Sequence, residues 1–309
     1  MEYQKTIGPR SWADLLLLAL IWGGTFVAVG IGLREIGVLT LVAFRVLGGA
    51  IVLWIYVFAK GLQIPKKPSV WGAFLIMGLL NNVIPFSLIT WGQTYTEAGL
   101  AAILNGSTAI FGVLVAAMVF ADEKLSRSKV IGVTLGFVGV ATAMGLSHLG
   151  QFNLTSLAQL AILGASISYA FAGAWGRSKL QRLSPQVAAA GMTGFSGAIM
   201  AGLALSIEGG PTMNYSAPIW VALIYLAAAA TALAYLLYYR ILAAAGSGNL
   251  LLVTLLIPPV AIGLGALMLG ENLTNQAILG FVILAFGLII LDGRALRAVS
   301  RKNQSQRQP

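Results

Sequence analysis

The polar residues that could bind a solute are few, and they lie inside long apolar stretches. Asn81 and Asn82 fall near the middle of one stretch, and Asn105 and Ser107 near the middle of the next. An amide or hydroxyl group in hydrocarbon must find a partner or line a wet cavity. Each of these residues alone fits hydrogen bonding between helices as well as it fits substrate contact. Their clustering near one depth favours a polar cavity in the middle of the membrane.

Arg45 is a charged residue placed well inside an apolar stretch, about seven residues from its start, which is roughly 10 Å in a helix. A charge at that depth costs a few kcal/mol or more unless it is paired or hydrated. Two interpretations follow. Arg45 anchors the carboxylate of a substrate, or it is a structural charge that pairs with backbone carbonyls or with Glu97, which starts the fourth stretch.

Deep aromatic residues are the third candidate component of the cavity. Trp22 and Tyr169 lie well inside their stretches, and they nearly correspond between two similar halves of the chain, with an offset of 147 residues. Tyr235 lies towards the inner end of the eighth stretch. Deep aromatic side chains usually serve packing, but a pocket for planar amphipathic solutes uses the same kind of wall. We therefore include all three in the predicted cavity.

The residue types needed for catalysis or metal binding are scarce. The sequence has no Cys and a single His, His148, so a thiolate metal site is excluded and little remains for general-base chemistry. No pair of carboxylates falls within the apolar stretches, and the glycine-rich phosphate-binding loop of ATP-driven pumps is absent. We therefore expect neither an enzyme nor an ATP-driven pump, and we expect no cofactor and no metal.

The elements that must position these residues are membrane-spanning helices. The chain has 309 residues, of which 58% are hydrophobic and 9% charged, with a mean hydropathy of +0.88; soluble domains carry roughly 25% charged residues. A bilayer core about 30 Å thick needs roughly 20 apolar residues per helix. The sequence therefore predicts an all-α integral membrane protein with ten transmembrane helices, at 13–32, 38–59, 70–91, 98–120, 129–146, 156–175, 186–207, 217–239, 247–269 and 276–292.

The basic residues predict the orientation of these helices. Seventeen of the nineteen Lys and Arg residues fall in alternate loops or at the two termini. By the positive-inside rule both termini are cytoplasmic, and the protein spans the cell (inner) membrane. The net charge of +10 comes from these loops and the C-terminus, so we expect the lipid bilayer as a partner and no nucleic acid.

The chain contains one segment twice. Residues 98–145 align with residues 246–293 at a constant offset of 148, without a gap. This duplication divides the chain into a first repeat at 13–146, a second at 156–293 and a basic cytoplasmic tail at 294–309. Five helices per repeat give the repeats opposite orientations, which is a transporter architecture with its site near the midplane. The matching pairs are Glu123 and Glu271, Leu125 and Leu273, Gly132 and Gly280, Gly139 and Gly287, and Gly145 and Gly293.

Several of these segments resemble the EamA family of the drug/metabolite transporter (DMT) superfamily. The run from Leu256 through Glu271 resembles the second EamA repeat, and Trp22-Gly23-Gly24 resembles the signature of the first helix. Arg45 resembles an arginine of the second helix. The resemblance covers residues 13–293 as two five-helix inverted EamA repeats, and the chain is most similar to the YddG-type exporters of aromatic amino acids. Because family members with different substrates would share this arginine, the resemblance favours its structural role.

The repeats differ at their centres and turns. Pro258 and Pro259 predict a helix break beside the cavity, because a proline removes a backbone donor. The first-half counterpart of Pro258 is Ile110, so this break is expected on one side only. In the turns, Glu123 and Glu271 are expected to cap the helix that follows each of them.

These features together predict a secondary transporter. It would export small amphipathic metabolites, amino acids first and aromatic ones among them, by alternating access through a central cavity. The alternatives are efflux of drugs or quaternary cations, sugar-nucleotide exchange, and a receptor or scaffold without transport. We expect the protein to work as a monomer. Because no carboxylate falls within the central turns of any stretch, we also expect facilitated diffusion without proton coupling.

Overall fold

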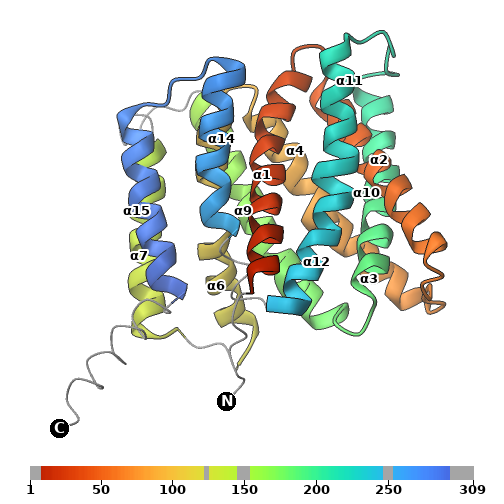
Figure 1. Ribbon diagram of the computed structural model, residues 1–309, viewed down its shortest axis with the longest axis horizontal. Helices are drawn as coiled ribbons and strands as arrows, with labels where there is room; N and C mark the ends of the chain where they lie inside the picture. Colours follow the sequence, from red (N-terminus) through yellow and green to blue (C-terminus); the bar gives the residue numbers. More distant parts are fainter. Residues whose placement is uncertain (1–7, 122–124, 145–153, 246–252, 293–309) are drawn as a thin grey trace.

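The computed structural model describes residues 8–121, 125–144, 154–245 and 253–292, and every regular element within them is helical (Figure 1). The first half forms α1 (Pro9–Gly32), α2 (Val38–Ala59), α3 (Pro68–Gly78), the π-helix η1 (Leu79–Val83), α4 (Ile84–Gly92), α5 (Ala98–Asn105), α6 (Thr108–Val119) and α7 (Arg127–Met144). The second half forms α9 (Leu154–Lys179), α10 (Pro185–Ile207), α11 (Ala217–Ile224), the π-helix η2 (Tyr225–Leu233), α12 (Ala234–Ala245), α14 (Val253–Leu269) and α15 (Asn275–Asp292).

Eight helical segments in the described part of the chain are long and apolar enough to cross a membrane. Three of them combine consecutive elements, namely Pro68–Gly92, Ala98–Val119 and Ala217–Ile241. Two further apolar helices, Val253–Leu269 and Asn275–Ile290, are shorter. A helix of 17 residues is about 25 Å long, slightly less than the hydrocarbon core. The all-helical, multi-pass fold is confirmed, and the count of ten crossings stays a prediction.

The main helix contacts between the two halves are symmetric: each has an equivalent in which the two halves are exchanged. The contact of α2 with α10 and the contact of α7 with α15 each join equivalent helices of the two halves. The contact of α1 with α14 is matched by that of α9 with α6, and the contact of α1 with α12 by that of α9 with α4. In Figure 1, α3 and α4 run upwards whereas α11 and α12 run downwards. Exchanging the halves therefore reproduces the packing with the direction reversed.

The repeated glycines bring α7 and α15 into backbone contact. A Cβ atom on Gly139 would meet the backbone of Gly280 and Leu284, and one on Gly287 would meet the backbone of Gly132 and Gly136. Without side chains at these points the helices approach closely, as small residues allow in membranes. The glycines that reveal the duplication in the sequence thus lie in the contact between the two halves.

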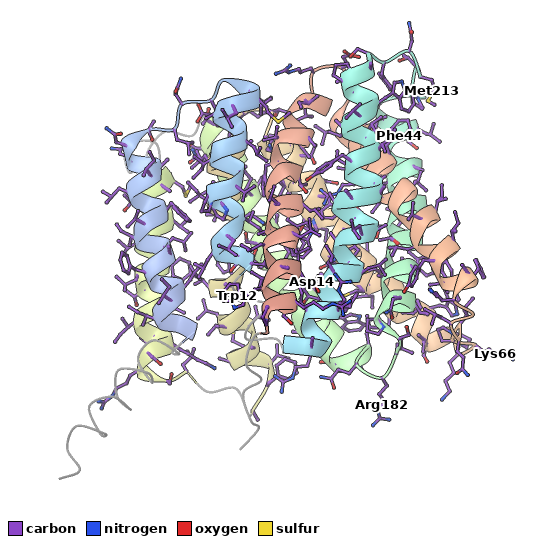
Figure 2. All side chains as sticks on the ribbon, viewed as in Figure 1. Trp12, Asp14, Phe44, Lys66, Arg182 and Met213 are labelled. Carbon is purple, nitrogen blue, oxygen red and sulfur yellow. The ribbon has the colours of Figure 1, made fainter. Side chains whose placement is uncertain are left out.

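The outer surface of the helical layer is apolar, as a lipid-facing surface must be. Ile51, Ile55 and Phe58 on one face of α2 are between 60% and 66% exposed, which a soluble protein would rarely tolerate in one patch. Figure 2 shows side chains around the whole layer, with Lys66 and Arg182 at its lower side. Both residues belong to loops predicted to be cytoplasmic, so the structure gives these loops a common side.

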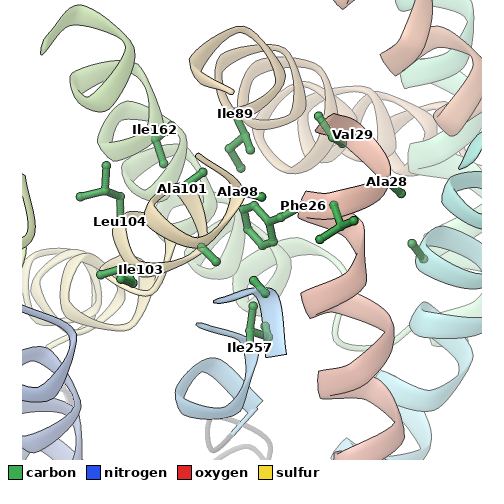
Figure 3. Packing of buried hydrophobic residues seen from close by; sticks show 14 of the residues in the cluster. Phe26, Ala28, Val29, Ile89, Ala98, Ala101, Ile103, Leu104, Ile162 and Ile257 are labelled. Carbon is green, nitrogen blue, oxygen red and sulfur yellow. The ribbon is translucent and has the colours of Figure 1, made fainter. Parts of the chain in front are cut away.

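The interior is filled by small and branched side chains from both halves. Figure 3 shows Phe26 of α1 close to Ala98 and Ala101 of α5, with Ile162 of α9 and Ile257 of α14 around them. All five are less than a tenth exposed. The small alanines of α5 lie close to the ring of Phe26, so side chains of four helices meet in one buried cluster (Figure 3).

Three carboxylates on the upper side of the layer each cap a helix of the opposite half. Glu208, after α10, accepts hydrogen bonds from the backbone N–H groups of Leu39 and Thr40 at 2.9 Å each. Glu35, after α1, accepts one from the N–H of Ser216 at 2.9 Å. The hydrogen bonds that Ser216 donates lower the pKa of Glu35. Negative charge at a helix N-terminus is stabilising, so these caps hold the halves together.

Glu271 is the third of these caps, and its role differs from the prediction. Its carboxylate accepts hydrogen bonds from the N–H groups of Ala98 at 2.7 Å and Gly99 at 3.2 Å, at the start of α5. The helix that follows Glu271 is capped instead by Thr274, whose hydroxyl accepts the N–H of Ala277 at 3.2 Å. The carboxylate reaches α5 because α14 ends beside α5. Glu123, its counterpart, and the tail at 294–309 lie outside the described residues.

The described lower side carries a different link. Arg240 of α12 forms a salt bridge with Asp14 of α1, and its Nε donates to Asp14 Oδ2 at 2.7 Å. Figure 2 shows Asp14 near the lower end of α1. Among the described residues, helix caps thus link the halves on the upper side, and the ion pair of Asp14 and Arg240 joins α1 to α12 on the lower side.

The predicted topology can be tested with single cysteines in this Cys-free chain. A membrane-impermeant maleimide should label an Asn214→Cys variant in intact cells, because the loop at 208–216 is predicted outside. A Lys66→Cys variant should be labelled only after the membrane is opened. Labelling of Lys66→Cys in intact cells with protection of Asn214→Cys would overturn the assignment.

The start of α5 gives a prediction about pH. Glu97 precedes α5 and makes no capping hydrogen bond, and partial burial together with the charge of Glu271 raises the pKa of Glu97. The ionised form therefore opposes folding at neutral pH, and this cost disappears as the pH falls through the raised pKa. Glu97→Gln should raise the midpoint of thermal unfolding at pH 7.5 by about 1–2 °C, a small effect because Glu97 is exposed.

Glu271→Gln provides the matched control for Glu97→Gln. It removes a charge that accepts two N–H groups of α5, so it should lower the midpoint at pH 7.5 by about 2–4 °C. The gain in Glu97→Gln should vanish at pH 4, where wild-type Glu97 is protonated. Equal shifts of the same sign in both variants would show that the two carboxylates do not act as described.

Candidate functional site

The centre of the molecule is built on two π-helical segments at equivalent places in the two halves. Segment η1 interrupts the third span, and η2 interrupts the eighth. A π-helix shifts the backbone hydrogen bonds by one residue, and such segments are frequent at functional sites. Neither π-helix was predicted from the sequence. Asn81, Asn82 and Pro85 were a signal for η1, whereas the alanine-rich sequence of η2 carries none.

The π-helices expose backbone carbonyls, and hydroxyl groups satisfy them. Ser168 donates to the carbonyl of Leu80 at 2.7 Å. The single hydroxyl proton of Ser196 is shared between the carbonyl of Met192 at 2.6 Å and that of Gly78 at 3.2 Å. In η2, Thr231 donates to the carbonyl of Leu226, five residues earlier, at 2.8 Å. An unsatisfied carbonyl in hydrocarbon costs several kcal/mol. Irregular backbone therefore requires polar side chains around it.

Asn81, Asn82 and Tyr235 form one hydrogen-bonded cluster, and their place in a cavity wall stays a prediction. The Nδ2 atom of Asn81 donates to the Tyr235 hydroxyl at 2.8 Å, and that hydroxyl donates to Asn82 Oδ1 at 3.0 Å. Asn82 Nδ2 donates to Ser196 Oγ at 3.0 Å. This cluster joins the third span to the seventh and eighth, across the two halves. Asn82 and Ser196 are fully buried, whereas Asn81 and Tyr235 keep some exposure and are the members that a solute could touch.

Asn105 and Ser107 lie at a break in the fourth span, between α5 and α6. Ser107 is fully buried and donates to the carbonyl of Leu104 at 2.6 Å, so it serves the break itself. The carbonyl of Asn105 accepts a hydrogen bond from Thr108 at 2.7 Å. Its side-chain Oδ1 is buried and has no partner. A buried oxygen of this kind is normally paired, so Asn105 keeps an acceptor for water or a solute.

Pro258 and Pro259 do not break their helix, which corrects the prediction. Both lie inside α14, which runs without interruption from Val253 to Leu269. Pro258 is buried and Pro259 is exposed. A proline deprives only the carbonyl four residues earlier of its donor, and neighbouring helices can hold such a segment straight. The break lies instead in the first half, at Asn105–Ser107.

The Trp22-Gly23-Gly24 sequence has a packing explanation. A Cβ atom on Gly23 would meet Val260 and the carbonyl of Ile257 in α14, and one on Gly24 would meet the hydroxyl of Tyr225. That hydroxyl donates to the carbonyl of Ile21 at 2.6 Å. The two glycines thus let α14 and η2 approach α1.

Two of the aromatic candidates, Trp22 and Tyr169, pack against other apolar side chains in the structure. The ring of Trp22 packs against that of Tyr238, with centroids 5.9 Å apart. Tyr169 of α9 is half-buried and packs against a cluster that includes Phe86 of α4. Trp22 and Tyr169 also pack against the same main core cluster, and their placement in a cavity wall stays a prediction.

Arg45 lies in a contact that the sequence did not predict. Its Nε donates to the hydroxyl of Thr231 in η2 at 3.3 Å, and its guanidinium lies over the ring of Phe86, 3.8 Å from the centroid. The pairing with Glu97 is not formed, because Glu97 is exposed at the end of the span, and Arg45 makes no salt bridge with any described residue. The hydroxyl of Thr231 thus donates to a carbonyl of η2 and accepts a hydrogen bond from Arg45.

A solved structure shares this fold. A chain titled "Crystal structure of protein" superposes with a TM-score of 0.67 at 17% sequence identity, covering 93% of this chain and 97% of that one. At this identity the likeness shows the arrangement of the helices alone.

Several bacterial relatives align over nearly the whole chain. A Salmonella typhimurium protein named "Probable amino-acid metabolite efflux pump" is 28% identical over 286 residues, covering 89% of this chain and 92% of its own. The Escherichia coli protein of the same name is 27% identical, with the same coverage. "Uncharacterized transporter YvbV" of Bacillus subtilis is 25% identical and covers 93% of each chain.

The match to a protein family covers both halves. The EamA-like transporter family aligns twice, at residues 12–145 and 156–291, in register with the two packed halves of the structure. The duplication, the helical layer and the polar centre between the halves fit that description. The chain is therefore a transporter of the EamA-like family, within the drug/metabolite transporter superfamily.

Proposed function

We propose that this protein exports amino acids and related small amphipathic metabolites, aromatic amino acids among them. The observation that carries the proposal is the hydrogen-bonded cluster of Asn81, Asn82, Tyr235 and Ser196, which joins both halves beside the π-helices. A polar cluster that bridges two oppositely oriented halves is where a transporter of this architecture binds its solute. The names of the two enterobacterial relatives support amino acids as the substrate class.

Movement of the two halves against each other would expose this cluster to either side in turn. The interactions on the two sides support such alternation, because the helix caps of Glu35, Glu208 and Glu271 lie on one side and the pair of Asp14 and Arg240 on the other. Closing one side and opening the other would exchange one set of contacts for another. The protein would act in the cell membrane, as a monomer with both termini cytoplasmic.

Export of drugs or quaternary cations is the second candidate, and Arg45 argues against it. A buried positive charge near the polar cluster, without a described carboxylate beside it, repels a cationic solute. Sugar-nucleotide exchange would require several cations for the phosphates, and Arg45 is the only Lys or Arg that is buried in the described chain.

Purified protein in liposomes tests the proposal. With unlabelled phenylalanine inside, counterflow of labelled phenylalanine should exceed that of empty liposomes, and tetraethylammonium or a sugar nucleotide should not compete. Tyr235→Phe should lower the flux by about 3–10-fold, because it removes the hydroxyl that links Asn81 to Asn82.

Tyr239→Phe is the matched control for Tyr235→Phe. Tyr239 lies one turn further along α12, where its ring packs edge-on against Tyr238. Flux in this variant should equal that of the wild type. No flux of any amino acid, with flux of the cation or the nucleotide, would refute the proposed substrate class.

A second prediction concerns energy coupling. The five acidic side chains that the structure describes lie at helix ends or in loops, where Asp14, Glu35, Glu208 and Glu271 each have a partner. None is placed to carry a proton through the centre. Counterflow should therefore be equal with and without an imposed pH gradient. Concentrative uptake that an uncoupler abolishes, and that Glu97→Gln lacks, would contradict facilitated diffusion.

A further inference from the structure

The buried guanidinium of Arg45 has no counter-ion among the described residues, and we propose that it binds the carboxylate of the transported solute. This inference rests on the proposed function and narrows its substrate class to molecules that carry a carboxylate. Arg45 is 9% exposed and is the eighth residue of α2, which places it roughly 10 Å from the start of the helix.

The five acidic side chains that the structure describes either have other partners or are exposed. Arg45 forms no salt bridge with any of them. The acidic groups are used as follows: Asp14 pairs with Arg240, Glu35, Glu208 and Glu271 cap helices, and Glu97 is exposed.

The neighbours of Arg45 satisfy only part of its guanidinium. A guanidinium has five N–H donors, and one of them, on Nε, bonds to Thr231 at 3.3 Å. The face of the group lies against Phe86, which compensates part of the charge through the ring quadrupole. The two terminal nitrogens make no hydrogen bond with the described residues, and they are not among the fully enclosed unpaired atoms. Four donors thus remain for a ligand.

A carboxylate matches these free donors. It accepts two parallel N–H bonds from a guanidinium, and such charge-assisted pairs are stronger and better oriented than neutral hydrogen bonds. An unpaired buried charge costs several kcal/mol, so an incoming anion also relieves a cost already present in the empty protein. The arrangement therefore favours a carboxylate over a neutral group of the same shape.

The surroundings set the orientation of the solute. Tyr235 lies within range of the charge of Arg45 and also bonds to Asn81 in the polar cluster. A solute held by its carboxylate at Arg45 would extend beside Tyr169 and Tyr235 towards Asn81. The phenol rings provide an apolar face with a polar edge, which suits the side chain and ammonium group of an amino acid.

A purely structural role makes a different prediction. If Arg45 served only to hold Phe86 and Thr231, its replacement would affect folding and the transport of all solutes alike. A binding role affects solutes with a carboxylate and leaves others unchanged. The test must therefore compare two solutes that differ only in that group.

Phenylalanine and phenylalaninamide form such a pair in competition against labelled phenylalanine counterflow. The wild type should prefer the acid over the amide by about 10–100-fold in half-inhibitory concentration. In Arg45→Gln this ratio should fall to about one, because the acid loses affinity while the amide does not. Arg45→Lys should give an intermediate ratio, since it keeps the charge and loses the paired geometry.

Arg34→Gln is the matched control, because Arg34 is an exposed arginine shortly before α2, and it should keep the wild-type ratio. Thermal unfolding of each variant checks the fold. If Arg45→Gln does not fold, a wild-type ratio near one overturns the inference by itself. A ratio retained in folded Arg45→Gln also overturns it and leaves amino-acid transport standing. Absence of flux for every amino acid refutes the proposed function instead.

Discussion

Hydrocarbon offers no hydrogen bonds, and this constraint decides where each polar group of the protein can lie. The two π-helices free backbone carbonyls in the middle of the layer, and the hydroxyls of Ser196 and Thr231 lie against two of them. The same hydroxyls then accept hydrogen bonds from Asn82 and Arg45. The polar centre is therefore linked to the irregular backbone, because two hydroxyls beside the π-helices each accept a hydrogen bond from a larger polar side chain.

The duplication makes each half incomplete without the other. Gly139 and Gly287 allow backbone contact only where α7 meets α15, and the N-termini of α2 and α5 find their carboxylates in the opposite half. A cap is worth about 1 kcal/mol, and a few such interactions hold the two halves in one arrangement without making it permanent. Contacts of this size are suited to a protein whose halves must move against each other.

The sequence predicted local features well and long-range pairings poorly. Apolar stretches marked the helices within a few residues, because hydropathy is a local property. Asn81 and Asn82 do bond to side chains of the other half, whereas the cavity predicted around them stays a prediction. The cap formed by Glu271 was assigned to the wrong helix, since the nearest N-terminus in sequence is not the nearest in space. The partners of Arg45 were missed for the same reason: Thr231 is 186 residues away, in a π-helix that the sequence pattern does not reveal.

The two halves repeat the same helices but not the same polar residues, and this asymmetry bears on how a solute is released. Asn105 and Ser107 occupy positions where the second half has Val253 and Leu255. The two halves therefore share a helical fold, but only the first half supplies polar side chains at these positions. A guanidinium stays protonated at physiological pH, so Arg45 cannot release an anion by giving up its charge. Release then requires water to reach the site as one side of the layer opens. Such a release step needs no proton and fits the facilitated diffusion proposed above, since the described carboxylates lie at helix ends or in loops.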